Sequence, residues 1–144
     1  MFVKKKESAQ RSRIAGVKIE HTAYQVDDPV ALSRWYVTHL GLGMRRAQTE
    51  PPFGHFLADD GGTVMLEFYR QAHLPVPDYR SMDPLLLHLA FLAGDVAAAR
   101  AKLMAAGATP EGDVITNAAG DEVAMLRDPW GLAIQLIKRA DPMI

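Results

Sequence analysis

Short runs of alternating hydrophobic and polar residues recur along the chain, and two longer segments carry apolar residues at helical spacing. Residues 17–26 and 85–92 alternate and are rich in β-branched or aromatic side chains, which predicts a strand in each place. A helix is predicted after each strand, beginning after the N-cap candidates Asp28 and Asp95 and ending at a glycine. Three more strands are predicted after each helix, at 43–49, 53–59 and 63–69 and at 109–116, 122–127 and 132–137.

The two halves of the chain follow the same plan. The ten residues around His21 align with those around His88 at an offset of 67 residues, and the four around Glu67 align with those around Gln135 at an offset of 68. An internal repeat of this kind indicates two copies of one structural unit. Each unit has the order strand, helix and three strands, so we predict an α+β fold of two βαβββ modules in tandem.

The predicted modules occupy most of the chain. The first covers residues 17–70 and the second residues 85–138, and a proline-bearing linker at 71–84 joins them. Residues 1–16 are expected to form a disordered basic tail, because chain ends are rarely held in place, and residues 139–144 to form a short C-terminal tail.

One face of each predicted sheet carries polar residues. A four-stranded sheet with a single helix covers only one of its faces, so the two open faces are expected to pair and enclose a cleft. Glu67, His88 and Gln135 each lie between apolar neighbours on a strand, which directs them away from the helix, and the repeat assigns His21 to the equivalent position. Taken singly, each is more often a surface or hydrogen-bonded residue, so the argument depends on their joint recurrence.

The composition limits the kinds of partner and cofactor. Sixteen Lys and Arg against seventeen Asp and Glu give the 144-residue chain a formal net charge of -1, which provides no field for gathering nucleic acid or anionic membrane. There is no apolar core of a signal peptide and no stretch near the ~20 apolar residues that span a bilayer, so we expect a soluble, cytoplasmic protein. No cysteine is present, so any metal would be held by nitrogen and oxygen ligands. The set His21, His88, Glu67 and Gln135 suits a divalent ion such as Zn, Ni, Co, Mn or Fe(II).

A series of short motifs extends over residues 17–138. They are His21 with Asp28, Ser33-Arg34-Trp35-Tyr36 continuing to Leu40-Gly41-Leu42, Met65-Leu66-Glu67, His88 with Asp95, Ala105-Ala106-Gly107-Ala108, and Asp128-Pro129-Trp130-Gly131 before Ile134-Gln135-Leu136. Together they resemble the vicinal oxygen chelate superfamily of glyoxalases, bleomycin resistance proteins and extradiol dioxygenases, and most closely its glyoxalase I-type single-chain members. The resemblance specifies the fold more than the reaction, since the superfamily includes enzymes and metal-free binding proteins.

The resemblance implies a metal held by His21, Glu67, His88 and Gln135 in a cleft between the two chains of a homodimer. In such enzymes a small substrate with two neighbouring oxygens chelates the metal, which stabilises an enediolate-type intermediate while a carboxylate moves a proton. Glu67 is the only carboxylate in the set, so it is the candidate general base. The expected activity is that of a glyoxalase-like lyase or isomerase.

Three more residues are candidates for contacting the substrate in this cleft. They are His55, Tyr69 and Trp130, on a short strand, at the end of a strand and in a turn. The alternative for His55 is a solvent-facing position on its strand, and the alternative for the two aromatic residues is a place in the core.

Two departures from the resembled pattern keep other functions open. Gln135 stands where glyoxalase I-type enzymes carry a glutamate base, and Gln25 stands where they carry an arginine for the glutathione carboxylate. One alternative is an Fe(II) extradiol-type dioxygenase, because His21, His88 and Glu67 form a two-histidine, one-carboxylate set. The other is a non-catalytic drug-binding protein of the bleomycin-resistance type, against which the retained ligand set argues.

Overall fold

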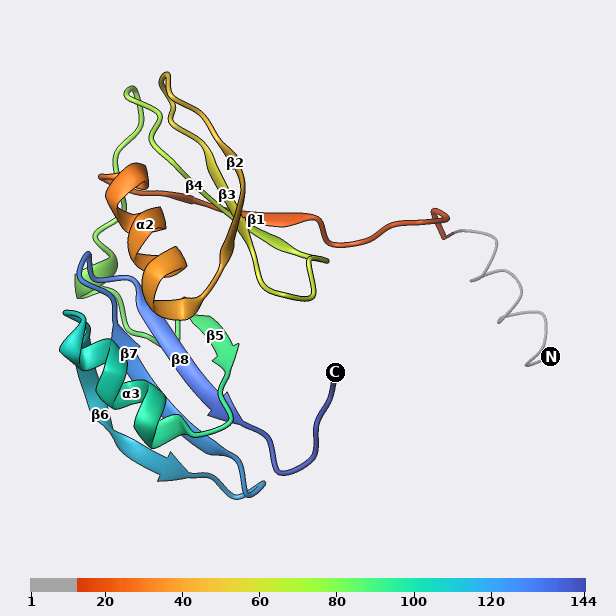
Figure 1. The fold of residues 1–144 in the computed structure, drawn as a ribbon, viewed down its shortest axis with the longest axis vertical. Helices are drawn as coiled ribbons and strands as arrows, with labels where there is room; N and C mark the ends of the chain where they lie inside the picture. Colours follow the sequence, from red (N-terminus) through yellow and green to blue (C-terminus); the bar gives the residue numbers. More distant parts are fainter. Residues whose placement is uncertain (1–12) are drawn as a thin grey trace.

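The computed structural model describes residues 13–144 as two sheet-and-helix modules, drawn in Figure 1. Most of the tail predicted at residues 1–16 lies outside the described residues. Each helix packs on one face of its own sheet, and the other face stays open. The first module contains β1 (His21–Gln25), α2 (Pro29–Leu40), β2 (Gly43–Ala47), β3 (His55–Ala58) and β4 (Met65–Tyr69). The second contains β5 (Leu89–Leu92), α3 (Val96–Ala105), β6 (Thr109–Thr116), β7 (Glu122–Arg127) and β8 (Ala133–Lys138).

The strand order confirms the predicted fold class. The first sheet has the order β1-β4-β3-β2 and the second the equivalent order β5-β8-β7-β6. In each sheet the first strand runs parallel to the last, and the other pairs are antiparallel. The register repeats as well, because Ala23 lies opposite Glu67 and Ala90 lies opposite Gln135. The duplication visible in the sequence is therefore a duplication of strand pairing.

The helix ends follow the sequence signals. The side chain of Asp28 accepts a hydrogen bond from the backbone N–H of Ala31, and that of Asp95 accepts one from Ala98, both at 3.0 Å. Helix α2 ends at Gly41, whose left-handed conformation (φ 71°) is available to glycine at little cost. Both N-cap predictions are confirmed.

Each module begins later than the alternating pattern indicates. The first strand starts at His21 rather than at residue 17, and Val17 and Ile19 are 72% and 69% exposed, so their alternation does not mark a buried face. The second starts at Leu89 rather than at residue 85. There the backbone N–H of Leu86 donates to the carbonyl of Asp83 at 2.9 Å, which closes a turn before the strand can form.

The two modules share one core and are joined on the helix side. The Trp35 indole N–H donates to the carbonyl of Ala106 at 2.8 Å, and the Tyr36 hydroxyl donates to Oδ2 of Asp128 at 2.9 Å. The ring of Tyr36 lies 5.1 Å from that of Phe68 in its own module and 6.3 Å from that of Phe91 in the other. Helix α2 thus fixes the modules to each other through its buried face and leaves the open sheet faces outside this junction.

Because Asp128 is buried at its contact with Tyr36, its contribution to the free energy of unfolding depends on pH. Loss of solvation raises the pKa of the Asp128 carboxyl above its usual 3.8, although the hydrogen bonds it accepts oppose this effect. A carboxyl whose pKa is higher in the folded state stabilises the fold when protonated, and this contribution is lost as pH rises through that pKa. We therefore expect the free energy of unfolding of the wild type, relative to an Asp128→Asn variant, to increase as pH falls from 7 toward 3.8. Urea unfolding of both proteins across this range measures the difference, and a difference that shrinks on acidification would contradict the burial argument.

The connection from Gln71 to Pro84 is bound at its beginning by Gln25. The side-chain amide of Gln25 donates to the carbonyls of Gln71 and Leu74, at 2.8 and 3.1 Å, and its oxygen accepts the backbone N–H of Gln71 at 2.8 Å. The hydroxyl of Tyr79 donates to the backbone carbonyl of Gln25 at 2.7 Å, and burial raises the pKa of this phenol to about 12, so it remains a donor. The side chain of Gln25 is therefore occupied with the connection.

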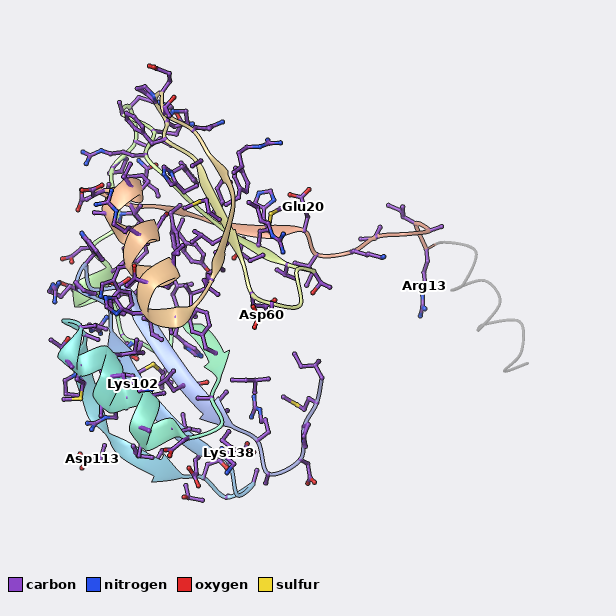
Figure 2. The ribbon with its side chains drawn as sticks, in the orientation of Figure 1. Arg13, Glu20, Asp60, Lys102, Asp113 and Lys138 are labelled. Carbon is purple, nitrogen blue, oxygen red and sulfur yellow. The ribbon has the colours of Figure 1, made fainter. Side chains whose placement is uncertain are left out.

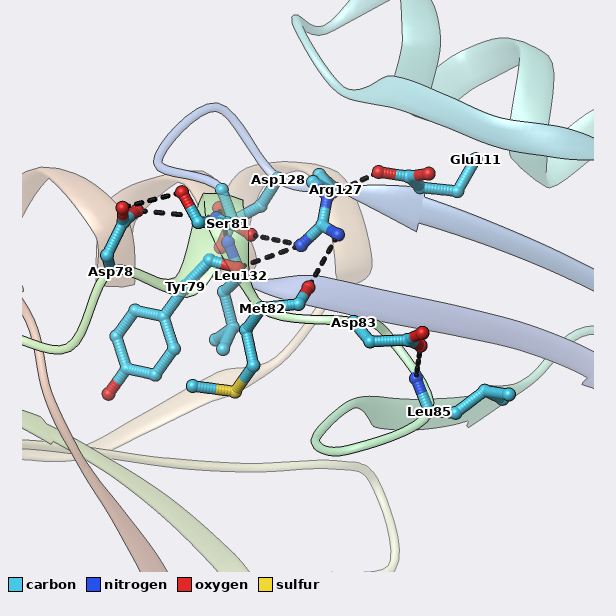
Figure 3. Close-up of polar contacts among 11 residues, drawn as sticks. Asp78, Tyr79, Ser81, Met82, Asp83, Leu85, Glu111, Arg127, Asp128 and Leu132 are labelled. Atoms are coloured by element: carbon cyan, nitrogen blue, oxygen red, sulfur yellow. Dashed lines mark hydrogen bonds and ion pairs between the residues drawn. The ribbon is translucent and has the colours of Figure 1, made fainter.

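The far end of the connection is bound by Arg127, as Figure 3 shows. This guanidinium donates to the carbonyls of Tyr79 (2.9 Å), Met82 (2.8 Å) and Gly131 (3.1 Å) and forms an ion pair with Glu111. The Arg127 side chain is only 8% exposed. Two of these contacts flank a short 3-10 helix, η1 (Tyr79–Ser81), since Tyr79 begins it and Met82 is its C-cap. Among residues 13–144, no helix is long and apolar enough to cross a membrane.

Candidate functional site

A row of four side-chain positions crosses the open face of the first sheet. Arg46 on β2 lies opposite Phe56 on β3, Phe56 opposite Glu67 on β4, and Glu67 opposite Ala23 on β1. Because residues opposite one another in a sheet share a face, these four point to the same side. The neighbours of Glu67 on β4, Leu66 and Phe68, pack into the core, so the row faces away from α2.

The structure brings His21 and Glu67 together on this face. Nε2 of His21 lies 3.5 Å from Oε2 of Glu67, and Nδ1 of His21 lies 2.9 Å from a carboxylate oxygen of Glu20. Glu20 is labelled in Figure 2, at the start of β1. An ionised carboxylate only accepts hydrogen bonds, so Nδ1, the nitrogen nearer to a carboxylate, donates to Glu20, and Nε2 is the ring nitrogen directed toward Glu67. The small side chain of Ala23, opposite Glu67, leaves room for this approach.

The equivalent histidine of the second module, His88, also has an oxygen acceptor at its Nδ1. His88 precedes β5 by one residue, and its Nδ1 lies 2.8 Å from the carbonyl oxygen of Pro84. A carbonyl also only accepts, so Nδ1 is again the protonated nitrogen and Nε2 is the one available to a ligand. Gln135 is half-buried on β8 between the buried Ile134 and Leu136, and so points to the open face as the sequence predicts.

These four side chains suit a divalent ion, but each module supplies only two of them; we call each such pair a half-site. Two ligands of a tetrahedral ion with bonds of about 2.1 Å lie about 3.4 Å apart, and the His21 and Glu67 atoms are 3.5 Å apart. In the described part of a single chain, however, no three or more His, Asp or Glu side chains gather closely enough to hold a metal. The first module therefore offers one histidine and one carboxylate, and the second offers one histidine and one amide.

The three candidate substrate contacts lie in three different places. His55 is buried and lies opposite Phe68, so it shares the helix-covered face, and its Nδ1 is 2.6 Å from the carbonyl oxygen of Phe53. Tyr69 has the same parity as Glu67 on β4 and is half-buried. Trp130 lines a hollow of about 670 Å³ between the connection and both modules, on which neither His21 nor Glu67 borders.

No motif of the sequence singles out Arg45 and Arg46, two consecutive arginines on β2. The pairing of β2 with β3 shifts between Met44 and Arg46, so Arg45 is the extra residue of a β-bulge. Both arginines line a hollow of about 320 Å³ together with Glu20, His21, Phe56 and Met65. A bulge depends on the pairing of two strands, and no local feature of the sequence marks this one.

The family model that matches the chain covers residues 18–136 and describes the Glyoxalase/Bleomycin resistance protein/Dioxygenase superfamily. The chain belongs to this superfamily. The resemblance in the sequence motifs is thereby confirmed, and the duplicated strand order is the fold of this superfamily. A comparison with curated proteins gave no significant match.

Solved structures of superfamily proteins have the same fold. The chain is similar to TnmS3, an antibiotic binding protein from Streptomyces, with 22% identity, a TM-score of 0.68, and coverage of 89% of this chain and 100% of that one. It is similar to a glyoxalase family protein from Enterococcus faecalis, with 25% identity, a TM-score of 0.66, and coverage of 87% and 100%. A glyoxalase I mutant from Zea mays matches with 22% identity and a TM-score of 0.68, over 86% of this chain and 46% of that chain.

Proposed function

We propose that this superfamily member is a divalent-metal-dependent, glyoxalase-like lyase or isomerase acting on a small substrate with vicinal oxygens. The observation that carries the proposal is the matched state of His21 and His88. In each module an oxygen acceptor binds Nδ1, so Nε2 is the nitrogen directed along the open sheet face, in His21 toward Glu67. This is the arrangement by which proteins prepare histidines as metal ligands.

The proposed site forms between two chains of a homodimer. Within one chain the modules pack through the side of α2, where Trp35 and Tyr36 contact the second module. The open faces lie outside this junction, and no complete ligand set gathers among residues 13–144. An open face of one chain can be covered by the complementary open face of a second copy, which completes both half-sites.

The residues of the site divide the chemistry between them. His21, Glu67, His88 and Gln135 would hold the ion, which when bound polarises the neighbouring oxygens of a substrate. A carboxylate oxygen of Glu67 takes the proton from the substrate carbon and returns it to the adjacent carbon or oxygen. Gln135 would hold the ion through its amide oxygen but cannot accept a proton, so Glu67 performs both transfers. Tyr69, on the same face as Glu67, is the best placed of the three proposed substrate contacts.

A second candidate function is that of a drug-binding protein without catalysis. The likeness to an antibiotic binding protein over the whole of that chain supports it. An Fe(II) dioxygenase would use the same histidines and Glu67, and the identity of the bound metal separates it from the lyase. A cytoplasmic location stays a prediction.

Metal content tests the proposed site directly. Inductively coupled plasma mass spectrometry of the tag-free protein is expected to find close to one Zn, Ni, Co, Mn or Fe ion per chain in the wild type. We expect the content to fall by tenfold or more in Glu67→Ala and His88→Ala, because each removes a ligand of the ion. His73→Ala is the matched control, since His73 is an exposed histidine of the connection, and it should keep the wild-type content.

The result separates the candidate functions. Absence of metal from the wild type, with no uptake after incubation with these ions, would contradict the metalloenzyme and favour the binding protein. Iron that both substitutions remove would direct the activity assays to oxygen uptake with catechols. Zinc, nickel, cobalt or manganese would direct them to lyase and isomerase substrates.

A further inference from the structure

The hollow beside the candidate metal ligands carries positive charge that the rest of the site does not use. We name it the Arg46 hollow; its lining is Glu20, His21, Arg45, Arg46, Phe56 and Met65. Its two carboxylate neighbours lie beside His21, with an oxygen of Glu20 2.9 Å from Nδ1 and an oxygen of Glu67 3.5 Å from Nε2. Among residues 13–144, neither Arg45 nor Arg46 takes part in an ion pair.

The bulge in β2 explains how two consecutive arginines reach one hollow. In a regular strand neighbouring side chains point to opposite faces, so only one of the two would face the site. The extra residue at Arg45 breaks this alternation, and bulges commonly redirect side chains next to functional sites. Arg45 extends toward the turn before β4, where its guanidinium lies close to Gly62. Arg46 keeps its place in the row with Phe56 and Glu67.

The position of Arg46 in that row fixes the distance between its charge and the carboxylate of Glu67. Its guanidinium carbon lies 5.9 Å from the centre of the Phe56 ring, so the charge is held over the ring by a cation–π contact. Strands β2 and β4 are two places apart in the sheet, which separates Arg46 and Glu67 by about 10 Å along the row. The Phe56 ring fills the interval, and the ring of His21 meets it edge-on at 5.7 Å.

We infer that the substrate of this site carries a carboxylate or phosphate group that Arg46 binds, separated from its reacting oxygens by an apolar spacer that lies over Phe56. The inference rests on the proposed function, because it describes the substrate of the same site. An arginine binds oxyanions through paired, charge-assisted hydrogen bonds, and an aromatic surface beside it favours a flat or apolar spacer. The second module has no such cation in the equivalent place, because Glu111 lies opposite Met125 there and is paired with Arg127.

Aromatic anions of known charge test the inference on metal-free protein. Benzoate and benzamide have the same shape and differ in charge, and each is titrated against isotope-labelled protein while the backbone and arginine side-chain NMR signals are followed. We expect benzoate to shift the signals of Arg46 and Phe56 and to bind the wild type about tenfold or more tightly than benzamide, as one charge-assisted pair implies. Arg46→Met should reduce this ratio to within about twofold, while Arg34→Met, an exposed arginine on α2, should leave it unchanged.

The anion titrations can fail or succeed independently of the metal measurement. Equal binding of benzoate and benzamide by the wild type, or signal shifts remote from the Arg46 hollow, would overturn the inference whether or not the protein binds metal. Charge discrimination that Arg46→Met removes would support it even if the metal proposal failed, because no metal is present. Phenylphosphonate titrated in the same way identifies the group: tighter binding than benzoate indicates a phosphate, and weaker binding a carboxylate.

Discussion

Pairing a His21→Ala chain with a His88→Ala chain should restore one metal ion per dimer, although neither variant alone holds any. In a site formed between chains, the first module of one chain meets the second module of its partner. The mixed dimer then contains one site with both substitutions and one site with neither. Co-expression with two different affinity tags and purification over both columns isolates this dimer, and its metal content is expected to be about half that of the wild-type dimer.

The reciprocal pairing is the control for this result. A chain carrying both His21→Ala and His88→Ala, paired with a wild-type chain, has one substitution in each between-chain site and should hold no metal. If each chain formed its own site, the two results would be exchanged, with one ion in the reciprocal pair and none in the first. The comparison therefore decides the location of the site without a substrate and without a structure of the dimer.

Replacing Arg127 by methionine should lower the free energy of unfolding by about 3 kcal/mol, because it removes a buried cation that satisfies several acceptors at once. The carbonyls of Tyr79, Met82 and Gly131 lose their donors, and the carboxylate of Glu111 loses its partner. Methionine keeps most of the volume of the arginine stem, so the loss reports the polar contacts. Guanidinium unfolding measures it, and amide exchange at residues 79–82 should become faster.

Glu111→Gln is the matched control for the Arg127 network. The Glu111 side chain is 40% exposed, so loss of its charge should reduce stability by less than about 1 kcal/mol. A similar loss in the two variants would mean that the ion pair, and not the carbonyl contacts, stabilises this region. Unchanged amide exchange at residues 79–82 in Arg127→Met would contradict the assignment of Arg127 as the anchor of the connection.

Features with local causes were predictable from the sequence. An aspartate cap and a left-handed glycine act within one turn of a helix, and both ends of α2 lie where these signals place them. Alternation correctly oriented Glu67 because its neighbours Leu66 and Phe68 are both apolar and both pack into the core. The same alternation oriented Gln135, whose register on β8 matches that of Glu67 on β4, and the repeat was needed for His21 alone.

Features that depend on pairing between strands were not predictable. His55 is followed by Phe56, Leu57 and Ala58, which leaves its parity undetermined, and only the pairing with β4 shows that it shares the buried face with Leu57. The bulge at Arg45 exists only relative to β3. Arg127 likewise depends on contacts with the distant connection, including the carbonyl of Met82.

Gln25 and Arg127, which bind the two ends of the connection, affect how the protein could select a ligand by size. Proteins that close around a ligand need a few backbone positions free to rotate, and here the segments at both ends are occupied by side-chain contacts. The relative orientation of the two modules of a chain is therefore set when the chain folds. In the proposed dimer each chain would present its two half-sites in a fixed relation, so the protein would discriminate between molecules by how well they fit the space between two rigid chains and not by how far a chain closes upon them.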